Sequence, residues 1–122
     1  MSNSKDTPVK LNRPFVGIPS FLRSHICTDL DELDADIAVF GVPHDEGSPF
    51  LAGSRMGPRS IREQSLRFGA PGSIYDPETR NQYLAEELGQ GLIADVGDVD
   101  VWPTEVRTTF KNATDMTRKI LS

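Results

Sequence analysis

The longest apolar run of the chain covers residues 37–42, between Asp36 and Pro43. A short run without polar alternation is typical of a strand that is buried on both faces of a parallel sheet. A second apolar run at 92–96 continues irregularly as far as residue 101. The hydrophobic pattern therefore predicts two strands.

A helix is predicted to follow the first strand. Pro58 stands directly after Gly57, and proline at the first helical position gives up no hydrogen bond that the helix needs. Gly69 would end this helix. The residues expected on its inner face are Ile61, Gln64, Ser65 and Phe68.

The strongest helical periodicity follows Trp102-Pro103-Thr104, and Arg118 and Lys119 lie where the helix dipole favours cations. Two weaker signals predict about one helical turn in the acidic run 29–36, and a short helix from Asp76-Pro77 to Leu88. The apolar stripe of the strongest helix, spaced 4, 3, 4 and 3 residues apart, is Val106, Phe110, Ala113, Thr117 and Ile120.

Strands that alternate with helices imply βαβ units and a parallel sheet. We therefore expect the α/β class, as an incomplete three-layer α/β/α arrangement. Residues 1–20 contain prolines that break any period, and they predict an N-terminal arm before a domain part at 21–122. Because only two strands are predicted and none follows the final helix, we expect the front of a larger domain.

Composition narrows the class of protein. The 122 residues carry a formal net charge of −5, which disfavours binding to nucleic acid. No apolar run is long enough to cross a bilayer, and the first residues lack the apolar stretch of a secretory signal peptide. A single cysteine, Cys27, cannot form an internal disulfide. These features predict a cytoplasmic protein with neither a nucleic-acid nor a membrane partner.

Acidic and basic side chains supply several candidate sites. Asp95, Asp98 and Asp100 could together hold a cation weakly, or Asp98 and Asp100 could form hydrogen-bonded turns. Arg59 and Arg62 share a helix face, which would suit either an anion or ion pairs with carboxylates of a neighbouring element. Further weak candidates are Cys27 and His25, interpreted as structural, and Trp102 and Phe110, interpreted as core or interface anchors.

Four stretches, in this order and spacing, resemble the N-terminal part of the ureohydrolases, the arginase/agmatinase family, and its agmatinase branch in particular. They are IAVFGVPHD at 37–45, GSRMGPRSIR at 53–62, IYDPET at 74–79 and ADVGDVDV at 94–101. The resemblance implies one α/β/α domain with two manganese (or nickel) ions at the carboxyl ends of its strands. It also implies a homo-oligomer that hydrolyses a guanidino compound such as agmatine to urea and an amine, as in polyamine metabolism.

The metal-binding motifs of that family, GGDH, DAHxD and DxDxxDP, do not occur in this sequence. The first of them would be expected directly after the final helix. We therefore expect an N-terminal fragment of a metal-dependent amidinohydrolase that holds no catalytic or metal-binding residue and is inactive alone. The alternative is a truncated, non-catalytic paralogue that acts as an assembly or binding module for a full-length ureohydrolase.

By resemblance, the loop 43–57 would border the mouth of the active site. His44, Asp45 and Glu46 follow the first strand, and ligands of α/β sheets bind at the carboxyl ends of strands. Three adjacent side chains diverge, so they do not predict a metal site of their own. They are interpreted as a rim whose carboxylates attract the ammonium group of agmatine. The equally weighted alternative is that they cap the loop or pair with Arg55.

Overall fold

The computed structural model describes residues 17–68 and 74–122, so the expected arm lies outside the described residues except for 17–20. Within them, three parallel strands form one sheet. The strand order is β1 (His25–Ile26), β5 (Ile93–Asp98) and β2 (Ile37–Gly41). Two of these strands are the predicted ones, and their parallel pairing confirms the α/β class.

The central strand is β5, whose residues 93–96 are all buried. The prediction that 37–42 is buried on both faces is wrong, because β2 is the outer strand of the described sheet and Ile37 is 38% exposed. The hydrophobic pattern missed β1, which has no apolar run. This strand exists through pairing alone, with His25 beside Ala94 and Ile26 beside Asp95.

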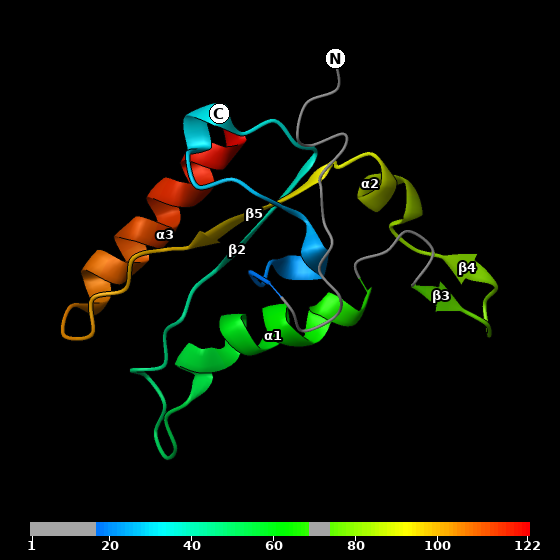
Figure 1. The fold of residues 1–122 in the computed structure, drawn as a ribbon. Helices are drawn as coiled ribbons and strands as arrows, with labels where there is room; N and C mark the ends of the chain where they lie inside the picture. The colour runs from blue at the N-terminus through cyan, green and yellow to red at the C-terminus, as the bar shows by residue number, and fades with distance from the viewer. Residues whose placement is uncertain (1–16, 69–73) are drawn as a thin grey trace.

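Helices α1 (Gly57–Ser65) and α3 (Val106–Leu121) lie on opposite faces of the sheet (Figure 1). Met116 and Ile120 of α3 pack on Ala94 and Val96 of β5. Asp95, which points to the other face because side chains alternate along a strand, bonds to α1. These contacts confirm the incomplete three-layer α/β/α arrangement.

Both predicted helices form, and each buries the expected face only in part: in α3, Ile120 packs on the core as expected. In α1, Ser65 is buried as expected, whereas Ile61 is exposed. In α3, Thr109 is fully buried and Phe110 is exposed. A hydrogen bond explains why Thr109 is buried. Its hydroxyl accepts from the Trp102 N–H at 2.9 Å, and this bond holds the helix against the preceding loop.

The helix predicted from Asp76 to Leu88 is wrong. Tyr75–Asp76 (β3) and Asn81–Gln82 (β4) form an antiparallel hairpin, and only Ala85–Gly89 (α2) is helical. The Asp76 carboxylate accepts hydrogen bonds from the Glu78 N–H and the Thr79 hydroxyl. The same acceptor chemistry that begins a helix here closes a turn instead.

The shorter helical elements complete the described chain. The predicted helical turn in the acidic run is confirmed as a 3-10 helix, Leu30–Glu32 (η2), with the Asp29 carboxylate accepting from the Asp31 N–H. Three further 3-10 segments are Phe21–Arg23 (η1), Ser54–Met56 (η3) and Leu66–Phe68 (η4).

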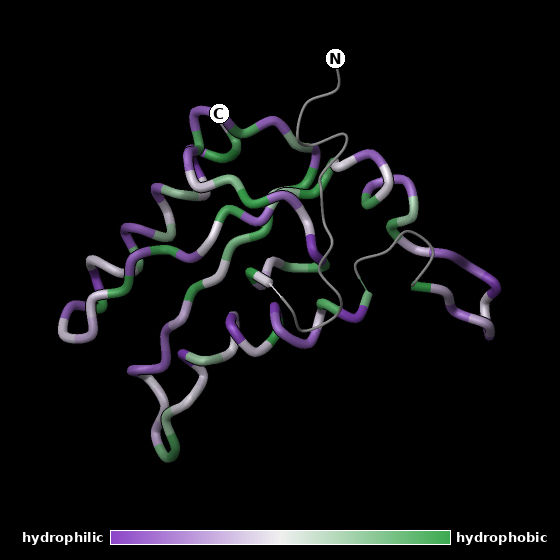
Figure 2. Tube along the Cα trace, in the orientation of Figure 1, coloured by the Kyte–Doolittle hydropathy of each residue, from purple (hydrophilic) through white to green (hydrophobic). Residues whose placement is uncertain are grey.

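Figure 2 shows apolar residues gathered along the middle of the sheet, and again at the tip of the loop between β2 and α1. At that tip, Phe50 is 87% and Leu51 is 74% exposed. The buried core is small and centres on Cys27, Ala94 and Val96. Among the described residues, no helix has both the length and the apolar character needed to cross a membrane.

Candidate functional site

The loops that leave the carboxyl ends of β2 and β5 enclose a hollow of about 180 Å³, here called the rim hollow. Ligands of parallel α/β sheets bind at this edge. One wall is the segment 43–46, which follows β2, and the opposite wall belongs to the loop between β5 and α3. The lining residues are Pro43, His44, Asp45, Glu46, Arg55, Val101 and Pro103.

Asp45 holds the loop between β2 and α1 closed. Its side chain is only 2% exposed, and it pairs with Arg55 at 2.8 Å. The carboxylate also accepts the N–H groups of Gly53 at 2.7 Å and Arg55 at 3.2 Å. The hydrogen bond from the Arg55 side chain is the main reason why the pKa of Asp45 falls to about 2. The geometry thus supports a loop-capping, arginine-paired Asp45, and Glu46 is the exposed carboxylate of the rim.

His44 belongs to the contact between this loop and α3. Its ring meets the Phe110 ring edge to face, with the ring centroids 5.4 Å apart. The backbone N–H of His44 donates to the Val42 carbonyl. Nδ1 of His44 is buried without a hydrogen-bond partner among the described residues. All three predicted rim residues therefore line one hollow, although each has a different environment. Their contact with a substrate stays a prediction.

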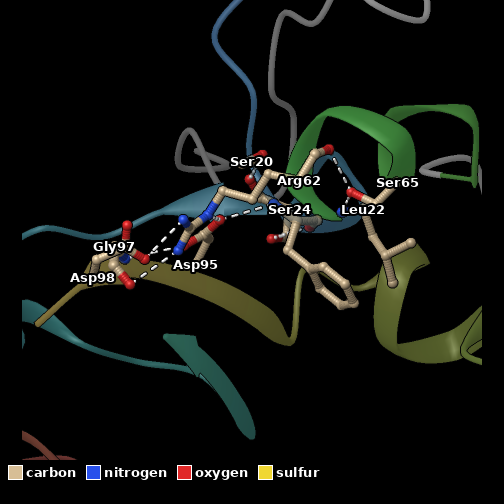
Figure 3. A network of polar contacts seen from close by, with 9 residues as sticks. Ser20, Leu22, Ser24, Arg62, Ser65, Asp95, Gly97 and Asp98 are labelled. Atoms are coloured by element: carbon tan, nitrogen blue, oxygen red, sulfur yellow. Dashed lines mark hydrogen bonds and ion pairs between the residues drawn. The ribbon is translucent and has the colours of Figure 1, made fainter. Parts of the chain in front are cut away.

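A second polar cluster, here called the Arg62 network, lies at the end of β5 (Figure 3). The guanidinium of Arg62 donates to both carboxylate oxygens of Asp95, at 2.8 and 3.1 Å. It also donates to the Gly97 carbonyl at 3.0 Å and pairs with Asp98 at 2.8 Å. The Arg62 and Asp95 side chains are 14% and 4% exposed, whereas Asp98, at 34%, is the member of the network that water reaches.

The hydrogen bonds of the Arg62 network favour the charged forms of Asp95 and Arg62. Burial raises the pKa of Asp95, but hydrogen bonds from Arg62 and from the N–H groups of Phe21 and Gly97 together bring it below its ordinary value. The same pairing raises the pKa of Arg62. A planar guanidinium suits this role because it can donate to several oxygens at once.

The structure shows which partners the charged side chains of α1 and β5 have. Arg62 forms ion pairs with β5, and Arg59 pairs with Glu63 on its own helix. Asp95 and Asp98 pair with Arg62, and Asp95 also accepts the N–H of Gly97, two residues further along β5. The prediction of ion pairs to a neighbouring element is confirmed for Arg62.

Sequence reasoning missed the segment η1, which completes the Arg62 network. The Phe21 N–H donates to Asp95 at 2.8 Å, and the Leu22 N–H donates to the Ser65 hydroxyl at 2.9 Å. That hydroxyl in turn donates to the Arg62 carbonyl. Asp95 itself was the available signal, because a carboxylate inside an apolar strand needs buried partners.

The donor set does not fit the metal centre that the resemblance implies. In the described ranges, no three side chains of His, Cys, Asp or Glu come together as they would around a metal ion. Cys27 is buried and donates to the Asp29 carbonyl, and His25 lies in β1. No catalytic step is therefore derived through a metal on these residues.

Residues 35–122 match the arginase family. The chain belongs to the arginase family. It is 37% identical over 99 residues to a human protein named guanidino acid hydrolase, mitochondrial, which covers 81% of this chain. It is 38% identical over 86 residues to a Gallus gallus protein named agmatinase, mitochondrial, and 37% identical over 57 residues to an agmatinase of Chromobacterium violaceum. These matches cover 70% and 47% of this chain.

The chain spans about a quarter or less of the length of these relatives, namely 25%, 22% and 17%. The resemblance drawn from the four motif stretches is confirmed at the level of the family. The chain is a ureohydrolase-type segment that carries part of an α/β domain.

Proposed function

We propose that this chain forms the front part of an enzyme that hydrolyses a guanidino compound to urea and an amine, and that it does not catalyse the reaction alone. The family match over residues 35–122 is the observation that carries the proposal. The names of its relatives, which include agmatinases and guanidino acid hydrolases, support the guanidino substrate class.

The metal part of the proposal concerns the complete enzyme. Two manganese (or nickel) ions would there generate hydroxide from water near neutral pH. The described part of this chain brings together no ligand set for them. Its contribution is structural: it places the rim hollow at the edge of the sheet where α/β proteins bind ligands.

Within that role, Glu46 is the residue we assign to the cationic end of an agmatine-like substrate. It lines the rim hollow and is exposed, whereas the charge of Asp45 is already paired with Arg55. An exposed carboxylate at a pocket mouth attracts an ammonium group and repels a carboxylate. His44 lines the same hollow and forms its wall toward α3.

A chimaera tests the proposal. Residues 35–122 replace the matching stretch of the human relative, and urea release is measured with agmatine and with guanidinobutyrate. We expect metal-dependent urea from the chimaera and none from the pure 122-residue chain. A folded but inactive chimaera beside an active parent would contradict the assignment, and urea release by the chain alone would contradict its incompetence.

The rim assignment has its own test in the same chimaera. Glu46→Gln is expected to raise KM for agmatine and to lower KM for guanidinobutyrate, because the carboxylate attracts the first and repels the second. Arg59→Gln is the control, because the Arg59 side chain is 74% exposed, pairs with Glu63 and is not among the residues that line the rim hollow. Equal KM changes for both substrates would remove the electrostatic argument.

The alternative function is an assembly or binding module for a full-length ureohydrolase. The exposed Phe50 and Leu51 at the loop tip favour it, since adjacent exposed apolar side chains are typical of contact surfaces. Coding sequence that continues after Ser122 with a strand and a GGDH motif would favour the enzyme.

A homo-oligomeric assembly is part of the enzyme proposal, and the cytoplasmic location stays a prediction.

A further inference from the structure

The contacts of Arg62 surround the point where the chain leaves β5. Arg62 bonds to Asp95 within the strand, to the Gly97 carbonyl and to Asp98 at the strand end. Gly97 has φ +87°, a conformation that side chains rarely adopt, so the strand bends at this residue. A single side chain from α1 thus fixes both sides of the bend.

The end of β2 is tied to the same contacts. Gly41 lies opposite Asp98, and the Val99 N–H donates to the Gly41 carbonyl at 3.0 Å. A Cβ on Gly41 would come within 2.3 Å of the Asp98 carboxylate and 2.7 Å of Pro58 at the start of α1. Asp98 therefore reaches Arg62 only because residue 41 is a glycine.

The same network holds a strained segment. Leu22 and Arg23 both have positive φ, at 53° and 56°, which is unfavourable for residues with side chains. Hydrogen bonds from η1 to Asp95 and Ser65 maintain this conformation. Strain of this kind persists where the surroundings impose it, and it gathers at functional sites.

Both walls of the rim hollow begin a few residues beyond this network. His44 follows Gly41 after two residues, and Val101 follows Asp98 after two. We propose that Arg62 is a positioning residue: it sets the direction in which both loops leave the sheet and so gives the rim hollow its shape. The catalytic consequence of this role rests on the proposed function, whereas the positioning itself does not.

Trp102 reports on the position of one wall. It is the single tryptophan of the sequence, it lies between the lining residues Val101 and Pro103, and it is four residues beyond Asp98. Its emission maximum and its quenching by acrylamide can be measured in the full chain at low concentration. Circular dichroism of the same samples shows whether the helices remain folded.

The main variant is Asp98→Asn, which removes one charged arm of the Arg62 network and leaves the Asp95 pair in place. Arg62→Lys, which keeps the charge but loses the planar fork, is the second variant. We expect both to shift the Trp102 emission to longer wavelength and to increase quenching, at unchanged circular dichroism. Arg59 lies on the same helix and pairs with Glu63 instead of with the network, so Arg59→Lys is expected to match the native chain.

Unchanged Trp102 emission and quenching in folded Asp98→Asn would overturn the positioning role. Should Arg62→Lys fail to fold, Asp98→Asn alone decides the question. In the chimaera, Asp98→Asn is expected to lower kcat/KM while Arg59→Lys does not. An inactive native chimaera would refute the proposed function only, because the Trp102 measurement tests the positioning without any catalysis.

Discussion

Two aspartate–arginine pairs lie near the same edge of the sheet, and they differ in one respect. In both, the aspartate side chain is almost completely buried, at 2% exposure for Asp45 and 4% for Asp95. Arg55, however, is 56% exposed, whereas Arg62 is 14% exposed. A buried carboxylate alone therefore does not make a buried ion pair, because the exposure of the cation sets how strongly water screens the interaction.

The largest expected effect comes from Arg62→Met. It leaves Asp95 with no cationic partner in a buried position, so we expect the free energy of unfolding to fall by about 3 kcal/mol. Urea denaturation followed by circular dichroism measures the change. A loss below about 1 kcal/mol, the size found for exposed pairs, would remove the contrast between the two pairs.

Gly41→Ala tests the packing that brings Asp98 to Arg62. The added methyl group would collide with Asp98 and Pro58, and we expect a loss of about 2 kcal/mol in the free energy of unfolding. Gly47→Ala is the matched control, because its Cβ would meet no atom within 4 Å. Similar unfolding midpoints for the two variants would show that the close approach at Gly41 carries no cost.

Arg55→Met is expected to destabilise the chain less than Arg62→Met. Without Arg55's guanidinium, Asp45 still accepts the backbone N–H groups of Gly53 and residue 55, and water can approach from the open side. The same urea titration provides the measurement. A loss equal to that of Arg62→Met would mean that exposure of the cation does not matter here.

The pH dependence of stability tests the Asp45 pair by itself. Its pKa is about 2 in the folded chain against an ordinary value of 3.8. A lowered pKa means that the folded state favours the carboxylate, so its stabilisation is complete above pH 4 and is lost as the pH falls toward 2. We expect Asp45→Asn to show a shallower loss of stability across this window than the native chain. Parallel acid-denaturation curves would contradict the assignment.

The smallest effect is expected from Arg59→Met. Arg59 and Glu63 form an exposed i,i+4 pair, and such pairs contribute at most about 0.5 kcal/mol. Raising the salt concentration should remove this contribution while leaving the difference between native chain and Arg62→Met nearly unchanged. Thermal unfolding at two salt concentrations measures both.

The sequence revealed those elements whose signal is local. The strands β2 and β5 carry apolar runs, and α1 and α3 carry a proline start or a helical stripe. It did not reveal β1, because two residues become a strand only by pairing with β5. Nor did it reveal the hairpin at 75–82, because the acceptor Asp76 suits a turn as well as a helix.

The candidate site likewise contains residues that the sequence could place and contacts that it could not. His44, Asp45 and Glu46 could be placed at a strand end from the sequence, since the strand itself was clear. The partners of Arg62 could not be chosen, because Asp95 is 33 residues away and is brought near by the fold. Likewise, Thr109 is buried for its hydrogen bonds to Trp102, a reason that hydropathy does not register.

The placement of α1 and α3 on opposite faces has a topological consequence. Connections between parallel strands are right-handed, and the step from β2 to β5 passes over the α1 face. A right-handed step that leaves β5 over the α3 face must run in the reverse direction, past β2. Any parallel strand joined to β5 through α3 would therefore lie along the outer edge of β2. The winding of the sheet reverses between that strand and β2, and such reversals are where α/β proteins open a crevice for their ligands.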